Sequence, residues 1–326
     1  MKLGLLLLNG EMKDLVATAR RAEAAGFSGV YVAEVYRSAW VLLTAIAAAT
    51  DKITLGPYVI NAYARSPLVA GMSAIDFNEF ANGRLVLGVG GGNREVNEVW
   101  QGIPHARVLT KLREYVQILQ RMARCPAGEA LHFEGKIHRM QWTPVVQPLA
   151  TPFPVFLAAV FPDMLRVAAA CADGIAGGAT LSAEYLKNVM QPRAAAYAEA
   201  AGRDPAGLRW RSVMFAAVND DREQARHDVR AALCRLYAPL PHPYYEYTMR
   251  EQGFGAVVDQ LLRLMPAGET EAAIKAIPDE AVDMLCIAGT KAECQAKVRA
   301  YEGVVEELLL VGVGGDAVSA ELIEKN

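Results

Sequence analysis

The chain has 326 residues, of which 53% are hydrophobic and 21% are charged, with a formal net charge of -3. This length can enclose a large core, and a slightly acidic chain without a basic cluster argues against nucleic acid as a partner. The apolar run at residues 3–8 is too short to span a bilayer. We therefore expect a cytoplasmic protein that binds neither nucleic acid nor membrane.

Cysteine and histidine give no sign of a metal site. The five cysteines are scattered without a C-x-x-C pair, and the five histidines form no ligand pair of the H-x-x-x-H kind. The odd cysteine count and wide spacing suit reduced thiols. The prediction is a protein without a metal ion.

In its N-terminal half the chain alternates short apolar runs with stretches of helical periodicity. Strands are predicted at residues 2–8, 27–33, 53–60 and 85–89. Each is followed by a predicted helix, at residues 14–25, 41–50, 68–80 and within 95–124. This order is typical of consecutive strand–helix units with a parallel sheet.

The C-terminal half continues the alternation, with strands predicted at 155–160, 173–178, 209–218 and 307–313. Helices are predicted at 164–171, 183–201, 222–237 and 291–301. Two stretches interrupt the rhythm, at about 125–152 and 239–281, and the second regains helical periodicity near 257–265. Eight strand–helix units favour an α/β fold, a (β/α)₈ TIM barrel forming a single domain over residues 1–326, with both stretches as insertions.

Residues 84–93, Arg-Leu-Val-Leu-Gly-Val-Gly-Gly-Gly-Asn, combine a buried strand with a run of glycines. A dinucleotide-binding fingerprint requires G-x-G-x-x-G. Starting at Gly88, the third glycine position is Asn93, and starting at Gly90 it is Glu95, so the fingerprint fails in both registers. What remains is a strand end whose backbone approaches either a ligand or a tight turn.

The active site of such a barrel lies at the C-terminal ends of its strands. The predicted ends carry few charges and many glycines: Leu7, Asn9, Glu34, Val59, Asn61, Gly90 to Asn93, Val160, Gly177, Gly178, Gly314 and Gly315. They contain no nucleophile–base arrangement and no pair of carboxylates for glycoside chemistry. A site of this kind suits a large planar cofactor that brings its own reactivity, which indicates redox chemistry.

Five segments carry a resemblance to a known family: "GFSGVYVAE", "ITLGPYVINAYARSP", "GRLVLGVGGGN", "PVFLAAV" and "ADGIAGG". In order and spacing they resemble the bacterial luciferase-like flavin and deazaflavin oxidoreductases. Within these the chain looks closest to the branch typified by methylenetetrahydromethanopterin reductase, which uses coenzyme F420. The resemblance covers nearly the whole chain and implies a luciferase-like barrel.

The resemblance also implies roles for single residues. A non-prolyl cis peptide at the end of strand three, matching Tyr58-Val59, would bulge against the deazaflavin ring. Asn61 would bond the pyrimidine edge of the cofactor, or would be a simple turn residue. Gly90, Gly91 and Asn93 match the loop beside the ring, where relatives often carry an acidic residue near position 93.

Two further strand ends match functional positions of the family. Glu34 matches an acidic residue that faces the ring and serves as the candidate catalytic acid. Here Val35 follows it where the family usually has histidine, so a helix N-cap or a salt bridge at the barrel rim is the alternative. The set Ala176, Gly177 and Gly178 matches the loop that binds the cofactor phosphate, with an ordinary strand-to-helix turn as the alternative.

Other polar or aromatic groups are expected near the mouth, mostly as packing or solvated surface: Tyr36, Tyr63, Arg65, His105, Tyr244 and Tyr245. The 239–281 stretch is interpreted as a lid over the substrate, or as a surface insertion that covers a subunit contact. Family resemblance alone implies a homodimer.

By this resemblance the protein is a coenzyme F420-dependent oxidoreductase. It would transfer a hydride between the deazaflavin C5 and a small organic substrate, reducing C=C, C=N or C=O or running in reverse. An FMNH2-dependent luciferase-like monooxygenase, with FMN as cofactor, is the alternative. A non-catalytic flavin-binding protein and an unrelated hydrolytic or lyase barrel stay open as well.

Overall fold

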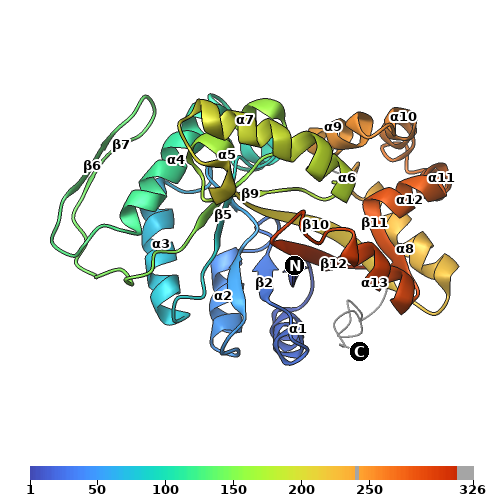
Figure 1. Cartoon of the computed structure of the whole chain (residues 1–326), viewed down its shortest axis with the longest axis horizontal. Helices are drawn as coiled ribbons and strands as arrows, with labels where there is room; N and C mark the ends of the chain where they lie inside the picture. Colours follow the sequence, from blue (N-terminus) through green and yellow to red (C-terminus); the bar gives the residue numbers. More distant parts are fainter. Residues whose placement is uncertain (239–241, 314–326) are drawn as a thin grey trace.

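The computed structural model describes residues 1–238 and 242–313, and parallel strands form the centre of the molecule (Figure 1). The barrel strands are β1 Lys2–Leu7, β2 Gly29–Val32, β3 Thr54–Pro57, β4 Ile60–Asn61, β5 Leu87–Gly90, β8 Val155–Ala158, β9 Gly174–Ala176, β10 Arg209–Val218 and β12 Glu307–Gly312. They pair in the order β3-β2-β1-β12-β10-β9-β8-β5-β4. Because β3 and β4 are two parts of one strand, this order closes into a ring, and a bridge from Leu55 to Leu85 completes it.

Helices surround the barrel, as Figure 1 shows. They are α1 Met12–Ala24, α2 Ala39–Ala47, α3 Pro67–Phe80, α4 Val108–Met122, α5 Pro162–Cys171, α6 Ala183–Tyr185, α7 Gln191–Ala200, α8 Arg222–Cys234 and α13 Lys291–Arg299. A π-helical turn, η2 Leu186–Met190, joins α6 to α7, and the 3₁₀ turn η3 Pro205–Gly207 follows α7. The predicted α/β barrel is confirmed.

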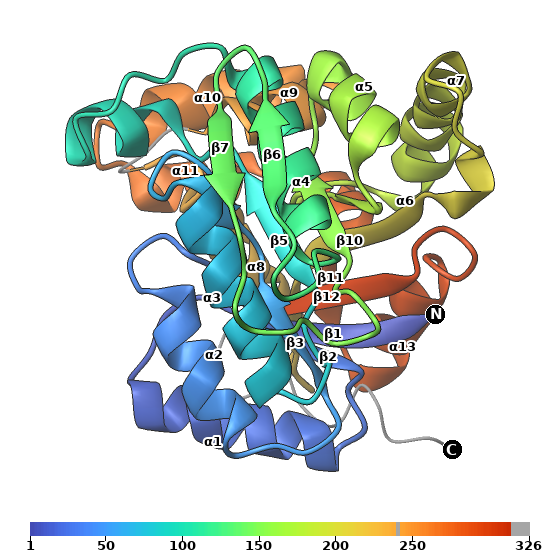
Figure 2. The same cartoon turned by 90° about the vertical axis from the view of Figure 1, so that its left-hand side faces the viewer.

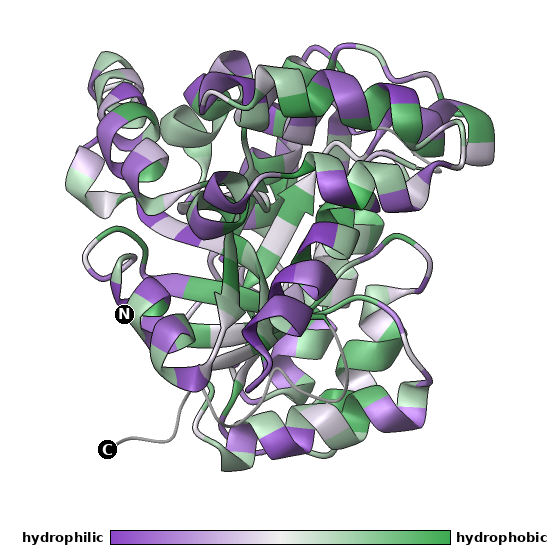
Figure 3. Ribbon diagram, turned by 90° about the vertical axis from the view of Figure 1, so that its right-hand side faces the viewer, coloured by the Kyte–Doolittle hydropathy of each residue, from purple (hydrophilic) through white to green (hydrophobic). Residues whose placement is uncertain are grey.

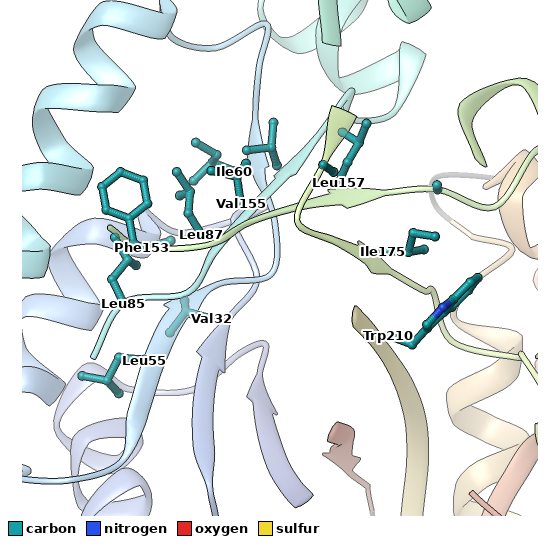
Figure 4. Packing of buried hydrophobic residues seen from close by; sticks show 14 of the residues in the cluster. Val32, Leu55, Ile60, Leu85, Leu87, Phe153, Val155, Leu157, Ile175 and Trp210 are labelled. Carbon is teal, nitrogen blue, oxygen red and sulfur yellow. The ribbon is translucent and has the colours of Figure 1, made fainter. Parts of the chain in front are cut away.

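Side chains along each strand alternate between the two sides of the barrel wall, as strand geometry requires. Leu5 and Leu7 pack in one buried cluster with the helices, whereas Leu6 between them belongs to a second cluster. Figure 4 shows part of the first cluster, where Leu87 and Val155 come from adjacent strands. Hydropathy follows the same division, with apolar strands at the centre and mixed helices outside (Figure 3).

A buried ion pair occupies the barrel interior near the start of β12. Arg211 Nη2 lies 3.1 Å from Glu307 Oε2, and the two side chains are 3% and 1% exposed. Tyr31 donates its hydroxyl to Glu307 at 2.7 Å, while the Arg211 guanidinium stacks on Phe156 with 4.5 Å to the ring centre. Burial raises the pKa of Tyr31 well above its ordinary value, so the phenol stays a donor.

The first insertion forms the antiparallel hairpin of β6 Leu131–Glu134 and β7 Arg139–Trp142, which lies over α4 (Figure 2). Its turn is fixed by Glu114 of α4. This carboxylate accepts the backbone N–H groups of Lys136, Ile137 and His138, the shortest at 2.6 Å. Burial alone would raise the pKa of Glu114, but these N–H bonds outweigh it and lower the pKa below its ordinary value.

The second insertion holds more structure than its sequence predicted. It contains α9 Pro243–Glu251, α10 Gly255–Leu264, α11 Thr270–Ala276 and α12 Asp279–Leu285. Only the helix near α10 was expected. The strand β11 Cys286–Gly289 was also missed, because a four-residue apolar run directly after a helix has no period of its own; it pairs with β10 outside the ring. Residues 239–241 of the insertion lie outside the described residues.

The long helix predicted within 95–124 is confirmed as α4, although it covers only the second part of that range. A π-helical turn, η1 Val96–Trp100, ends before α4 begins at Val108. Gly102 and Arg107 between them adopt left-handed φ angles of 66° and 53°, which a continuous helix cannot contain.

Two further findings hold for the described residues, and one prediction falls outside them. Within them no helix is long and apolar enough to cross a membrane. No group of three His, Cys, Asp or Glu side chains in that part of the chain could hold a metal ion. The predicted strand-end residues Gly314 and Gly315 lie outside it.

Candidate active site at the barrel mouth

The residues predicted from the strand ends gather at one end of the barrel, because all the barrel strands run in parallel. Asn61 ends β4, Gly90 ends β5 and Ala176 ends β9, while the other predicted residues lie within three positions of a strand end. This end is the C-terminal face, where barrels of this kind carry their active sites. We call it the mouth.

The peptide bond between Tyr58 and Val59 is cis, as the resemblance implied. Tyr58 continues from β3, and its side chain crosses to the sixth barrel strand, where its hydroxyl donates to the Gly177 carbonyl at 2.7 Å. The ring meets Tyr31 edge-on, with 6.1 Å between ring centres. Tyr58 therefore links strand three to the end of β9 across the mouth.

Two glycines of β5 lie against the Pro57–Val59 segment. A Cβ on Gly88 would lie 2.5 Å from the backbone oxygen of Pro57 and 2.9 Å from Val59 Cγ1, and one on Gly90 would lie 2.5 Å from Val59 Cγ2. A larger residue at either position would clash with this segment. The close approach predicted for this glycine run is thus first a contact with the neighbouring strand.

Asn61 is buried and bonded within the protein. Its Oδ1 accepts the N–H of Tyr63 at 2.9 Å, and its Nδ2 donates to Asn97 Oδ1 at 2.6 Å. Asn97, fully buried, donates in turn to the Gly91 carbonyl at 2.7 Å. These amides tie strand three to the loop after β5, and the proposed bond from Asn61 to the cofactor stays a prediction. Sequence reasoning missed Asn97, since nothing in its neighbourhood marks it.

Glu34 is held by two partners. Arg65 forms two hydrogen bonds with its carboxylate, at 2.5 and 2.8 Å, and the N–H of Ala39, the first residue of α2, donates to Oε1 at 3.2 Å. The Glu34 side chain is 11% exposed. Of the alternatives left open by the sequence, the rim salt bridge is present, whereas the N-cap residue of α2 is Ser38 and Glu34 only accepts the first N–H of that helix.

Glu34→Gln is expected to lower the free energy of unfolding by about 1–3 kcal/mol, because it weakens charged hydrogen bonds in a mostly covered site. Urea unfolding measures the loss. In Glu34→Gln/Arg65→Met, which leaves no unpaired guanidinium, the loss should be smaller. Unchanged stability of Glu34→Gln would mean that the pair contributes nothing.

The loop after β9 offers backbone donors. The N–H of Gly177 is taken by the Arg211 carbonyl at 2.8 Å. The following N–H groups, of Gly178, Ala179 and Thr180, have no acceptor among residues 1–238 and 242–313. Thr180 has a φ of 68°, and a Cβ on Gly178 would meet only Val160 and Tyr245, each at 3.8 Å. Successive backbone N–H groups without an acceptor are donors suited to an anion.

Helix α9 of the second insertion contacts several of these loops. Tyr244 donates its hydroxyl to the Gly92 carbonyl at 2.6 Å, and the ring of Tyr245 lies beside Gly178. His242, just before the helix, places Nδ1 3.0 Å from Asn93 Nδ2. Burial raises the pKa of Tyr245 to about 12. Of these, His242 was missed by sequence reasoning, because a single histidine beside prolines has no recognisable pattern.

With this geometry established, the chain belongs to the luciferase-like monooxygenase family, whose model matches residues 1–305. This family consists of flavin- and F420-dependent oxidoreductases. The chain is 28% identical over 273 residues to the 5,10-methylenetetrahydromethanopterin reductase of Archaeoglobus fulgidus, covering 82% of this chain and 80% of that protein.

Solved structures agree on the fold. The coenzyme F420 dependent tetrahydromethanopterin reductase from Methanopyrus kandleri matches with a TM-score of 0.82 and 20% identity, over 99% of this chain and 96% of that one. An F420-dependent secondary alcohol dehydrogenase in complex with an F420-acetone adduct matches with a TM-score of 0.76 and 16% identity, over the same shares. The resemblance to the luciferase-like family is confirmed.

Proposed function

We propose that the protein is a coenzyme F420-dependent oxidoreductase that transfers a hydride between the deazaflavin C5 and a small organic substrate. The observation that carries this proposal is the run of N–H groups from Gly178 to Thr180 that have no acceptor among the described residues. Coenzyme F420 joins an uncharged planar ring to an anionic tail, and these donors suit the phosphate of that tail.

The surroundings fit the ring as well. The Tyr58-Val59 segment lies at the mouth with both side chains partly accessible, and the nearby polar groups are engaged with each other. Glu34, the carboxylate of the predicted set, is neutralised by Arg65. A planar ring would therefore meet phenol, aliphatic and amide groups, which favours a cofactor that supplies the hydride itself.

The names of two structural neighbours support F420 over FMN: the reductase from M. kandleri and the secondary alcohol dehydrogenase are both described as F420 dependent. The family description names monooxygenases, so reduced FMN with oxygen activation is the second candidate. FMN carries a phosphate but lacks the longer tail, so the two cofactors should differ in affinity.

Fluorescence titration of the full chain with oxidised F420, and separately with FMN, tests the proposal. We expect saturable micromolar binding of F420 and no saturation with FMN. In Gly178→Val the added methyl groups would fill the space bounded by Val160 and Tyr245, so F420 affinity should fall at least tenfold, or about 1.4 kcal/mol. Gly207→Val, at a glycine with no atom within 4 Å of its Cβ position, should bind like the wild type.

Preference for FMN would replace the hydride-transfer proposal with oxygen-dependent chemistry. Binding of neither cofactor would contradict both. Equal F420 affinity of Gly178→Val and wild type would place the cofactor away from the loop after β9.

A further inference from the structure

His242 reaches the mouth from the second insertion and is tied there to the loop after β5. Its Nδ1 lies 3.0 Å from Asn93 Nδ2, and its ring packs edge-on against Tyr245 with 5.4 Å between ring centres. Asn93 is 8% exposed, so the contact is covered from solvent. A histidine from an inserted segment thus meets a buried amide of the loop after β5.

Hydrogen bonding determines which ring nitrogen of His242 carries the proton. The N–H of Glu95 donates to Asn93 Oδ1 at 3.0 Å, so the amide oxygen points to the backbone and the NH2 group points to His242. An NH2 group can only donate, and Nδ1 must therefore accept. In the neutral ring the proton is then on Nε2.

The surroundings keep this ring neutral. Burial lowers the pKa of His242, and no charged group contributes to the shift. The titratable groups packed nearby are the phenols of Tyr244 and Tyr245, whose pKa values burial raises, so both are uncharged at neutral pH. His242 is therefore a neutral donor through Nε2–H.

Most other donors at the mouth are occupied. Tyr58 and Tyr244 donate to the carbonyls of Gly177 and Gly92. His105 has two unpartnered ring nitrogens, but both are covered, and its ring packs against Tyr63. His242 Nε2, just before α9, and the Tyr245 hydroxyl, in its first turn, have no partner among the described residues and are not fully covered.

We propose that His242 is a catalytic residue that holds the carbonyl oxygen or imine nitrogen of the substrate through its Nε2–H. This inference rests on the proposed function. The bond polarises C=O or C=N, so the carbon accepts a hydride from the reduced deazaflavin while the π electron pair moves to the heteroatom. The heteroatom then takes a proton from water, and His242 keeps its own. A neutral imidazole stabilises developing negative charge in this way without acting as an acid.

The tautomer is tested first, by ¹⁵N NMR of histidine-labelled full-length protein, with the His242 signals assigned from His242→Gln. At pH 7 we expect a neutral ring with the proton on Nε2. In Asn93→Asp a carboxylate replaces the donor, so Nδ1 should bind a proton and the pKa of His242 should rise by about one unit or more. A proton on Nδ1 in the wild type, or a charged ring at pH 7, would overturn the proposal.

Turnover then separates this proposal from the one on which it rests. F420 affinity of His242→Gln should stay within about twofold of wild type. Its kcat with reduced F420 and cyclohex-2-enone should fall about 10²–10³-fold, the usual effect of losing one such donor. His227→Gln, at an exposed position of α8, is the matched control and should be unchanged.

The outcomes are distinct. If no variant and no wild-type protein binds F420, the proposed function falls. If F420 binds and His242→Gln keeps wild-type kcat, the role of His242 falls while the proposed function stands. If Tyr245→Phe loses kcat and His242→Gln does not, the donor is the Tyr245 hydroxyl and the assignment to His242 is wrong.

Discussion

Arg211→Met is expected to lower the free energy of unfolding by about 3–5 kcal/mol, because Glu307 would stay buried without its positive partner. In the wild type the two side chains are 3% and 1% exposed and approach within 3.1 Å. Tyr31 and Ser28 would still donate hydroxyls to Glu307, but neither brings a charge. Methionine also loses the guanidinium stacking on Phe156. Urea unfolding followed by circular dichroism measures the loss.

Two controls isolate the buried charge. Arg211→Met/Glu307→Gln removes both members of the pair and should recover a large part of the lost stability. Arg209→Met breaks a neighbouring pair with Glu306 whose side chains are 40% and 24% exposed, and should cost about 1 kcal/mol or less. Equal losses for Arg209→Met and Arg211→Met would contradict the assignment of the large effect to burial.

Gly56→Ala is expected to prevent the barrel from closing. A Cβ at position 56 would lie 1.8 Å from the backbone carbonyl oxygen of Val86. The backbone cannot easily move aside, because Leu55 donates to the Arg84 carbonyl and Val86 donates to the Leu55 carbonyl, each at 2.9 Å. These bonds belong to the bridge that joins β3 to the segment leading into β5. We expect a loss of more than about 4 kcal/mol, measured as loss of soluble folded protein.

Gly207→Ala is the matched control for Gly56→Ala. Gly207 lies in the 3₁₀ turn η3, where no atom would be within 4 Å of the new Cβ, so its stability should change by about 0.5 kcal/mol at most. If Gly56→Ala unfolded at the same midpoint as the wild type, β3 and the segment before β5 could move apart without a loss of stability.

Much of the barrel could be predicted from sequence because each wall strand is an apolar run with a helix after it. The strand at Arg209–Val218 agrees residue for residue with its prediction. The cis bond at Tyr58-Val59 came from family resemblance, since local residue preferences do not favour it. Strand β11 and helix α9 were not predicted, because neither has a clear periodicity of its own. We attribute their stability to tertiary contacts, those of β11 with β10 and those of α9 with the mouth loops.

At the candidate active site, the sequence identified which residues lie at the mouth but not which side chains they bond to. Glu34 was identified at its strand end, yet its bond to Arg65 joins residues 31 positions apart and has no local signature. The hydrogen bonds Asn61–Asn97 and Asn93–His242 also join residues far apart in the sequence, 36 and 149 positions respectively. Pairings of this length depend on the three-dimensional path of the chain, which composition and spacing do not determine.

The carboxylate of Glu114 makes attachment of the β6–β7 hairpin a proton-linked property. Because its pKa in the folded chain is lowered, the tether is at full strength above the ordinary carboxyl pKa and is lost as the pH falls through the lowered value. Acid would therefore weaken the attachment of the hairpin turn to α4 by protonating one side chain, while the apolar packing of Leu131 and Phe133 would persist.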